Sequence, residues 1–385
     1  MSVAVVGAGM GGLAAAAALR HLGIEVDVYE QARRFMRVGA GIQVTPNAAK
    51  VLRGLGIEEL VRERGFETHS QLVRDGASGE VVRELVMSVE QFGAPYVCMH
   101  RADLHGALAG AVPDERIHLN KALVALDQGR SRVRLFFADG STATADAVVG
   151  ADGMHSVVRE HVVGAVSAVY NGRSAYRGVL PAARLDRDFG SSRIMWSGLD
   201  RTVLVYHTRP NRGELCFVTG QPDSGEWMTR ESWSARGDPR QLRAEFAGFH
   251  VDVQALLDAC TECHITGTSY MDPLPRWSEG RAVLLGDACH TMAPRMAQGA
   301  AMAIEDAVVL ARCMSDVGGE NLQVAFARYE AHRKPRTSLL HALASDPQAS
   351  ARRGERHMGW LYGYDAWAVA LDGAPDQPES VAAAV

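Results

Sequence analysis

Gly7-Ala8-Gly9-Met10-Gly11-Gly12 stands between a short apolar run and an alanine-rich run, and this stretch decides the fold. Residues 2–6 predict a strand, and residues 13–22 predict a helix because alanine and leucine have high helix propensity. Gly7 permits a tight turn, Gly9 lets a pyrophosphate approach the backbone, and Gly12 lets the helix pack closely on the strand. The helix N-terminus, with its free N–H groups and dipole, favours an anion. The stretch therefore predicts a dinucleotide site.

A second strand, residues 24–29, ends at Glu30. A carboxylate at this position can accept hydrogen bonds from both ribose hydroxyls of an adenosine, and it repels a 2′-phosphate. A glycine-rich turn without a ligand is the alternative. It is the weaker interpretation because strand, turn, helix and acid all follow in order.

Two further motifs follow at long distance: Gly150-Ala151-Asp152-Gly153 with Ser156 and Arg159, and Gly286-Asp287-Ala288-Cys289-His290 with Pro294 and Gln298-Gly299. We expect Asp152 on a tight turn near the pyrophosphate, and Arg159 to pair either with it or with phosphate. Asp287 follows a predicted strand over residues 281–285 and suits a ribityl hydroxyl. The helix that begins after Gln298 would direct its N-terminus at the electron-rich edge of a flavin. Each motif alone is also compatible with an ordinary strand–turn–helix corner.

Composition is that of a globular chain of 385 residues, with 47% hydrophobic and 22% charged residues. The net charge of −5 gives no electrostatic footprint for nucleic acid. No apolar run approaches the ~20 residues that span a bilayer. The first strand begins almost at once and leaves no room for a signal peptide. We therefore expect a cytoplasmic protein that binds neither nucleic acid nor membrane.

Six cysteines are few for this length and indicate reduced thiols. Cys260 and Cys263 form a C-x-x-C pair, but no second ligand pair stands at a suitable spacing. No metal site is predicted.

The rest of the chain reads as mixed strands and helices without an internal repeat. Residues 133–137 and 147–149 predict a hairpin with a turn at 138–140. Residues 170–270 contain strand-like runs, among them 201–207 and 214–219. Helices are predicted over residues 239–260 and 299–314. No second glycine fingerprint is present, so a nicotinamide cofactor would have no separate fold.

The three motifs resemble those of the class A FAD-dependent aromatic hydroxylases, the family of the para-hydroxybenzoate hydroxylase type. Arg101, in His100-Arg101-Ala102-Asp103-Leu104, matches the family arginine that contacts the cofactor. Gly39-Ala40-Gly41-Ile42 with Pro46-Asn47 matches the stretch that lies against the isoalloxazine. Within the family the chain most resembles the 6-hydroxynicotinate 3-monooxygenases, and the salicylate hydroxylases more distantly. This likeness is carried by residues 296–300, 303–307, 216–220 and 362–365.

The resemblance implies an α/β fold, with a Rossmann-type FAD-binding domain, a β-sheet substrate domain and C-terminal helices. The FAD-binding domain would take residues 1–70, 95–170 and 270–335, and the substrate domain 71–94 and 171–269. A helical segment, 336–371, and a disordered tail, 372–385, would follow. The implied FAD-binding residues are Gly7, Gly9, Gly12, Glu30, Arg101, Asp152, Gly153, Asp287, Pro294, Gln298 and Gly299.

The family chemistry uses NADH or NADPH to reduce FAD, and the reduced flavin then activates O2 and attacks an electron-rich ring carbon. The protein positions the ring, excludes water and helps a ring hydroxyl to deprotonate. By resemblance we expect NADH, a small aromatic substrate, and a monomer or homodimer. Both resembled groups decarboxylate as they hydroxylate. The ring, the position attacked and the loss of carboxylate stay open.

The pocket positions depart from the relatives. Tyr206 matches a pocket tyrosine, whereas Gln43, Arg295 and Thr202 stand at histidines, and Arg193 stands at a small residue. Two arginines suit a carboxylate, since guanidinium binds it bidentately; solvent-facing arginines are the alternative. The substrate-binding candidates are Arg193, Tyr206, Arg295 and Gln43, and the catalytic candidates are Tyr206, His207 and Gln43. Strand alternation sends Tyr206 and His207 to opposite faces, and we expect Tyr206 to touch the substrate.

Three other functions were weighed. A flavin epoxidase or tailoring oxygenase would act on a larger hydrophobic substrate and would need no cationic anchor. A flavin-binding redox sensor would not turn over. A simple NAD-linked dehydrogenase would not explain the motifs at residues 152 and 287 and is set aside.

Overall fold

A six-stranded sheet carries the glycine-rich motifs. Its strand order is β19-β20-β12-β1-β2-β8. Its members are β1 (Ser2–Val6), β2 (Glu25–Tyr29), β8 (Ile117–His118), β12 (Ala147–Gly150), β19 (Ser278–Glu279) and β20 (Ala282–Leu284). All neighbours in it are parallel except β19, which runs antiparallel to β20. The computed structural model describes residues 1–37, 40–223, 235–317, 321–345 and 355–372.

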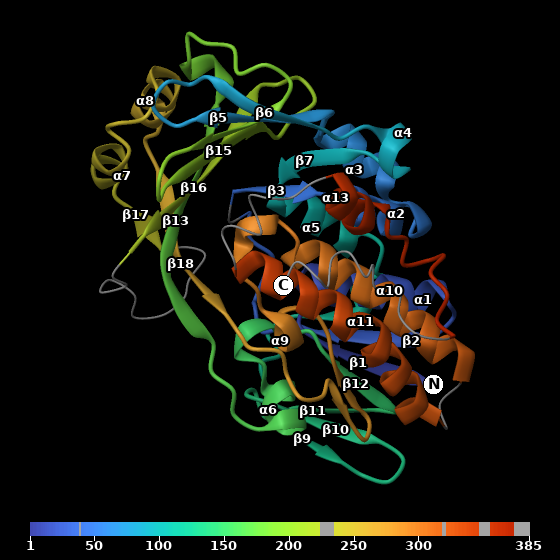
Figure 1. Cartoon of the computed structure of the whole chain (residues 1–385). Coiled ribbons are helices and arrows are strands. Elements are labelled where there is room, and N and C mark those ends of the chain that lie inside the picture. Colours follow the sequence, from blue (N-terminus) through green and yellow to red (C-terminus); the bar gives the residue numbers. More distant parts are fainter. Residues whose placement is uncertain (38–39, 224–234, 318–320, 346–354, 373–385) are drawn as a thin grey trace.

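Helix α1 (Met10–His21) follows β1 and lies against α10 (Gly299–Val317), and α10 lies in turn against α11 (Leu322–Ser345) (Figure 1). The alanines 14–18 of α1 are all buried. Their small side chains let the two helices approach closely, which is why an alanine-rich run can be a core element here. This packing joins the first motif to the helix that follows the third.

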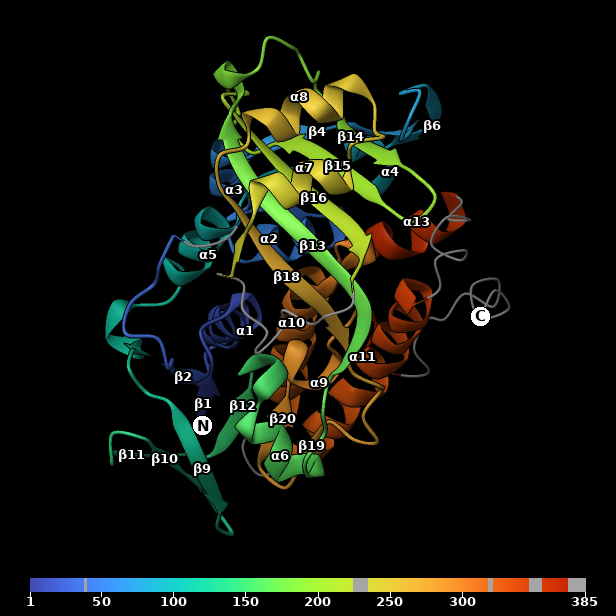
Figure 2. The ribbon, with the colours of Figure 1, turned by 90° about the vertical axis from the view of Figure 1, so that its left-hand side faces the viewer.

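An eight-stranded sheet forms the other half of the molecule (Figure 2). Its order is β17-β18-β13-β16-β15-β14-β5-β6. Its strands are β5 (Ser70–Asp75), β6 (Val81–Val86), β13 (Val169–Pro181), β14 (Arg193–Ser197), β15 (Thr202–His207), β16 (Glu214–Pro222), β17 (Arg236–Gly237) and β18 (Cys263–Tyr270). Helices α7 (Pro239–Glu245) and α8 (Val251–Ala259) pack on it through a separate apolar cluster that contains Trp196 and Phe246.

Smaller elements connect these two halves. They are the sheet β3-β7-β4, made of β3 (Gly41–Val44), β7 (Tyr96–His100) and β4 (Phe66–Thr68), and the helices α2 (Pro46–Gly54), α3 (Glu58–Arg64), α4 (Val89–Phe92), α5 (Arg101–Ala109), α6 (Val157–Val163), α9 (Asp287–His290) and α13 (Glu355–Gly363). A second three-stranded sheet contains β9 (Leu123–Gln128), β10 (Val133–Phe137) and β11 (Thr142–Ala145).

The predicted α/β class is confirmed, and two local predictions are wrong. The hairpin partner of β10 is β11, whereas residues 147–149 belong to β12, which pairs in parallel with β1. The helix predicted over residues 239–260 is two helices, because the chain turns at 246–250 and the His250 side chain caps α8 by accepting from the Asp252 N–H. The division into domains stays a prediction. The predicted tail lies, apart from Asp372, outside the described residues.

All six cysteines are free and buried, Cys260 and Cys263 among them. In the described part of the chain, no helix is both long and apolar enough to cross a membrane.

Candidate active site

The three motifs begin at the same edge of the six-stranded sheet. Val6 pairs with Gly150 across β1 and β12, and Gly150 pairs with Leu284 across β12 and β20. Because these strands are parallel, the turn after each of them emerges beside the next one. The carboxyl edge of such a sheet is where nucleotides bind in open α/β folds. Three stretches that lie far apart in the chain therefore form one surface.

Glycines allow these turns to touch. Gly7 has φ of +100°, and a Cβ there would lie 2.4 Å from the carbonyl oxygen of Ala151. A Cβ at Gly12 would lie 1.9 Å from the carbonyl oxygen of Gly7. At Gly9, by contrast, a Cβ would meet no described atom within 4 Å. Gly7 and Gly12 thus serve packing within the protein, while the backbone at Gly9 faces open space.

Glu30 holds the first turn in place. Its carboxylate accepts hydrogen bonds from the N–H of Ala8, at 2.7 Å, and from the N–H of Ala32, at 2.8 Å. The ring of His105 bonds the carbonyl oxygen of Ala8 at 2.8 Å. The acid is therefore directed at the glycine-rich turn, where the sequence places it.

Asp152 and Arg159 form a corner of their own. The Asp152 carboxylate accepts from the N–H of Val157, at 2.8 Å, and so caps α6. Arg159 is buried and donates to the carbonyl oxygens of Gly153 and Ala288. The Arg159 guanidinium thus contacts backbone carbonyls that join the second and third motifs, and the negative charge of Asp152 acts on it as well. Its pairing with phosphate stays a prediction.

The third motif turns sharply at Gly286, where φ is +64°. Asp287 follows at the start of α9, and its carboxylate lies 4.0 Å from an ideal Cβ on Gly299, the first residue of α10. Burial lowers the pKa of Arg101, and the negative charge of Asp287 opposes that shift, so the two charges are near enough to interact. Pro294 opens a single turn that ends at Ala297, whose φ of +53° is uncommon for a residue with a side chain.

Arg193 of β14 is buried, with 6% of its surface exposed, beside the three-stranded sheet β3-β7-β4. Its guanidinium carbon lies 4.3 Å from the centre of the Tyr96 ring. It donates to the amide oxygen of Gln71 at 2.6 Å and to the sulfur of Met87 at 3.3 Å, and its Nε finds no partner among the described residues. Neither acceptor carries a negative charge. Tyr96 in turn donates to Gln43 at 2.7 Å, which brings two predicted pocket residues onto one tyrosine.

Tyr206 and His207 are adjacent on β15, so strand alternation predicts that their side chains lie on opposite faces. Tyr206 lies in the apolar cluster between the two halves of the molecule, and its hydroxyl occupies the space that a Cβ on Gly41 would need. Burial raises the pKa of Tyr206 well above its ordinary value, so the hydroxyl stays protonated at neutral pH. His207 packs against the ring of Phe66 at 5.3 Å, and burial lowers its pKa. The side chain of Arg295 lies outside the described part of the structure.

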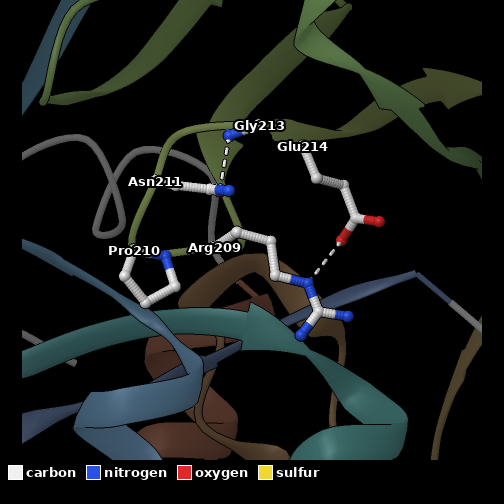
Figure 3. Close-up of a pocket in the computed structure, with 5 residues that line it drawn as sticks. All are labelled: Arg209, Pro210, Asn211, Gly213 and Glu214. Carbon is white, nitrogen blue, oxygen red and sulfur yellow. Dashed lines mark hydrogen bonds and ion pairs between the residues drawn. The ribbon is translucent and has the colours of Figure 1, made fainter.

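An open pocket of about 490 Å³ lies at the turn between β15 and β16 (Figure 3). It is lined by Arg209, Pro210, Asn211, Gly213 and Glu214. Arg209 reaches Asp103 of α5 at 2.9 Å, and Arg37 binds the same carboxylate at 2.6 Å. These ion pairs connect the eight-stranded sheet to the helix that begins with Arg101.

Comparison with known proteins identifies the family. The model of the FAD binding domain family matches residues 1–342. The chain is an FAD-dependent aromatic monooxygenase. It is 40% identical to the 6-hydroxynicotinate 3-monooxygenase of Pseudomonas fluorescens, over 96% of each chain. Solved structures of similar fold include a salicylate hydroxylase substrate complex (26% identity, 95% and 96% coverage, TM-score 0.82) and HpxO of Klebsiella pneumoniae with FAD and uric acid (27% identity, 94% and 92% coverage, TM-score 0.80).

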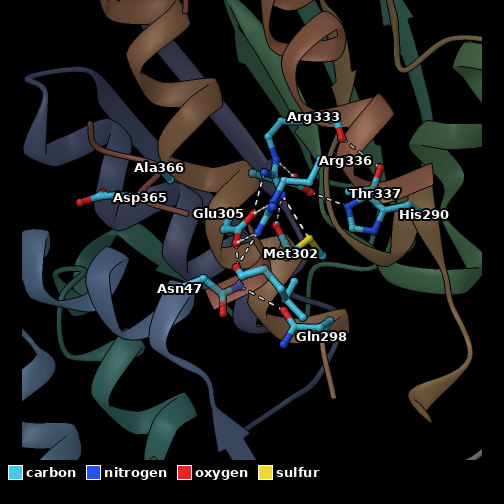
Figure 4. Close-up of polar contacts among 12 residues, drawn as sticks. Asn47, His290, Gln298, Met302, Glu305, Arg333, Arg336, Thr337, Asp365 and Ala366 are labelled. Atoms are coloured by element: carbon cyan, nitrogen blue, oxygen red, sulfur yellow. Dashed lines mark hydrogen bonds and ion pairs between the residues drawn. The ribbon is translucent and has the colours of Figure 1, made fainter. Parts of the chain in front are cut away.

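Behind its nucleotide-facing turns, the monooxygenase contains a buried charge network (Figure 4). Glu305 and Asp306 of α10 have no exposed surface, and Arg333 of α11 forms ion pairs of 2.6 Å with both. Arg336 binds Glu305 at 2.9 Å, and His290 of the third motif binds Asp306 at 2.6 Å. Each acid therefore has two basic side chains as partners, as a buried carboxylate requires.

Sequence reasoning missed this network and the neighbours of Arg193. One local signal for the network was available. Glu305 and Asp306 interrupt an apolar helical run, and two acids in such a run are expected to be buried and paired with basic residues. Nothing local indicates that Gln71, Met87 and Tyr96 meet Arg193, since they come from other strands and loops.

The Asp306 carboxylate predicts an acid-dependent stability. Burial raises its pKa, but His290 and Arg333 outweigh this, so its pKa lies below the ordinary value. A carboxylate whose pKa is lowered by folding stabilises the fold at every pH above its unfolded pKa of about 3.9. This stabilisation is lost as the pH falls below that value, through the folded pKa. We expect Asp306→Asn to lower the free energy of unfolding by about 3 kcal/mol at pH 7, and by progressively less below pH 4. Urea unfolding across this pH range measures both values.

Asp316→Asn on the same helix is the control. Asp316 pairs with Arg328 while half exposed, so the effect of its substitution should stay below ~1 kcal/mol at every pH. A constant difference between Asp306→Asn and the wild type from pH 7 to pH 3 would contradict the assignment.

Proposed function

We propose that this monooxygenase uses NAD(P)H and O2 to hydroxylate a small, electron-rich aromatic or pyridine ring that bears a carboxylate. The observation that carries the substrate class is the buried guanidinium of Arg193, whose described acceptors are both uncharged. An arginine remains protonated in proteins, and a buried charge without a counterion is costly. A carboxylate beside it would form the missing ion pair. Two of the similar proteins are named for 6-hydroxynicotinate and salicylate, and both of these compounds are ring carboxylates.

The residues present fit FAD. Gly9 leaves open space above the N-terminus of α1, and Glu30 points at that turn. Asp287, which follows β20, lies near Gly299, and its charge acts on Arg101. We therefore place the adenosine and pyrophosphate at the first turn, with Asp152-Gly153 beside them. The ribityl chain would lie at Asp287, and the flavin would lie beside Arg101, Pro294, Gln298 and Gly299. When bound, the flavin supplies the redox chemistry and the activation of O2.

Tyr206 would act as a hydrogen-bond donor to the ring hydroxyl. Its raised pKa argues against a tyrosinate base, and its position across from Gly41 places it beside the stretch that resembles the isoalloxazine-facing segment. Gln43, fixed by Tyr96, would help to position the ring. His207, on the opposite face, would not touch the substrate.

The test measures the oxidation of NADH and NADPH in the presence of hydroxylated benzoates and pyridine carboxylates. Each carboxylate is compared with its own amide, and product, CO2 and peroxide are measured in each reaction. We expect coupled turnover with at least one carboxylate and loss of it with the matching amide. Faster turnover with a large neutral substrate would favour the epoxidase or tailoring function instead. An absence of substrate-stimulated oxidation would favour the redox sensor. Gel filtration with light scattering decides between monomer and homodimer, and the free thiols support a cytoplasmic location.

A further inference from the structure

Two consecutive acids on α10 hold two different turns of the cofactor site. Glu305 accepts a hydrogen bond from the amide of Asn47, at 2.6 Å, in the first turn of α2. Asp306 accepts from the backbone N–H of Gly286, at 3.2 Å, and binds His290, both in the third motif. One helix therefore sets the relative positions of the turn after β3 and the turn after β20.

Asn47 also reaches the start of the same helix. Its Nδ2 donates to Gln298 at 3.1 Å as well as to Glu305, and both contacts are fully buried (Figure 4). Gln298 and Glu305 stand seven residues apart, which puts them on one face of α10, two turns from each other. Asn47 bridges those two turns and fixes α2 against the N-terminus of α10. Its Oδ1 has no partner among the described residues, so its amide is held only by the donating nitrogen.

Helix α11 holds the acid itself. Arg336 contacts both oxygens of Glu305, at 3.0 and 2.9 Å, and Arg333 adds an ion pair of 2.6 Å. Arg336 also donates to the carbonyl oxygen of Leu361 and stacks on the ring of Tyr364, 4.0 Å from its centre. The C-terminal helices thus hold the Glu305 carboxylate in a fixed place as a hydrogen-bond acceptor.

We propose that Glu305, acting through Asn47, is a positioning residue that fixes the flavin-facing end of the FAD site from behind. The start of α10 presents its N–H groups to the flavin edge, where a partial positive charge stabilises the anionic reduced ring. That stabilisation depends on the distance and direction of the helix start, which Asn47 fixes relative to α2. This inference rests on the flavin placement proposed above and does not depend on which ring is the substrate.

Asn47→Leu tests the proposal without leaving a charge unpaired. Leucine has nearly the shape of asparagine and donates no hydrogen bond, while Glu305 keeps both arginines. With substrate absent, we expect FAD to bind about tenfold more weakly, because the two hydrogen bonds that fix α2 against the start of α10 are lost. We also expect a more negative reduction potential of the bound flavin and an absorption spectrum closer to that of free FAD. Should this variant fail to fold, Asn47→Ser takes its place, with the same expected direction.

Arg312→Met is the matched control. Arg312 lies farther along α10 and donates to the carbonyl oxygens of Ala366 and Val369, so its loss also removes two hydrogen bonds that join α10 to another segment. We expect it to lower the melting temperature and to leave the flavin potential and spectrum unchanged. If Asn47→Leu behaves in the same way, with a lower melting temperature and unchanged flavin properties, the network is merely structural and the proposal is overturned. If no ring carboxylate supports turnover of the wild type while Asn47→Leu changes the flavin properties as expected, the substrate assignment fails and this proposal stands.

Discussion

Replacing Arg193 with methionine is expected to raise the KM for the carboxylate substrate roughly a hundredfold while leaving FAD binding intact. Removing one partner of a buried, hydrogen-bonded charge pair costs about 2–5 kcal/mol, and the methionine leaves the substrate carboxylate without a cation. The protein without substrate should be no less stable, and it should even gain, because an uncompensated buried charge is removed. Steady-state kinetics and thermal unfolding measure the two effects.

Two comparisons make this prediction specific. Arg201→Met removes an arginine directly before β15 that pairs with Asp200 at the surface, and the KM of this variant should match that of the wild type. The amide of the substrate should bind equally weakly to the wild type and to Arg193→Met, since only the carboxylate distinguishes them. Arg193→Lys should be intermediate, because an ammonium does not bind bidentately. An unchanged KM in Arg193→Met would refute the carboxylate anchor.

Two glycine substitutions in the first motif are expected to separate cofactor binding from folding. Gly12→Ala should destabilise the protein severely, because its Cβ would lie 1.9 Å from a backbone oxygen that belongs to the tight turn itself. A Cβ at position 9 would meet no described atom within 4 Å, and Gly9 has φ of −72°, which any residue adopts. The fold should therefore tolerate alanine there. The methyl group instead occupies the space above the N-terminus of α1 where we place the pyrophosphate.

Titration with FAD and thermal unfolding of the apoprotein provide the measurements. Gly9→Ala should keep the melting temperature of the wild-type apoprotein and bind FAD at least tenfold more weakly. Gly12→Ala should yield little folded protein at all. Normal FAD affinity in Gly9→Ala would place the pyrophosphate elsewhere.

The strand, glycine turn and helix of the first motif could be predicted because their determinants are local. A strand, a glycine turn, a helix and an acid follow one another within thirty residues, and each position has a backbone reason for its residue type. The same local reasoning failed at residues 147–149, where pairing with β1 depends on a strand far away in the chain. It failed at residues 239–260 because apolar spacing continues across a turn that the cap at His250 imposes.

The substrate end is determined by contacts between distant elements. The resemblance indicated Arg193 and Tyr206, but the partners of Arg193 come from β5, from β7 and from the segment after β6. Glu305 lies on α10 and Arg336 lies on α11. The apolar periodicity of each helix predicts only that these positions are buried. Which acid meets which arginine follows from the packing of α10 on α11, which no single helix pattern contains.

The strand order of the six-stranded sheet also bears on how the chain is made. β1 and α1 are synthesised well before β20, which belongs to the same sheet, and before α10, which packs on α1. At about 5–20 residues per second, the nascent chain carries an uncovered apolar helix and two open strand edges for tens of seconds. The eight-stranded sheet is completed before the nucleotide sheet around which the chain begins. The yield of active protein should therefore depend on chaperones that protect extended apolar segments and on the supply of FAD once the nucleotide sheet is complete. These two factors should matter more than the packing of the folded core.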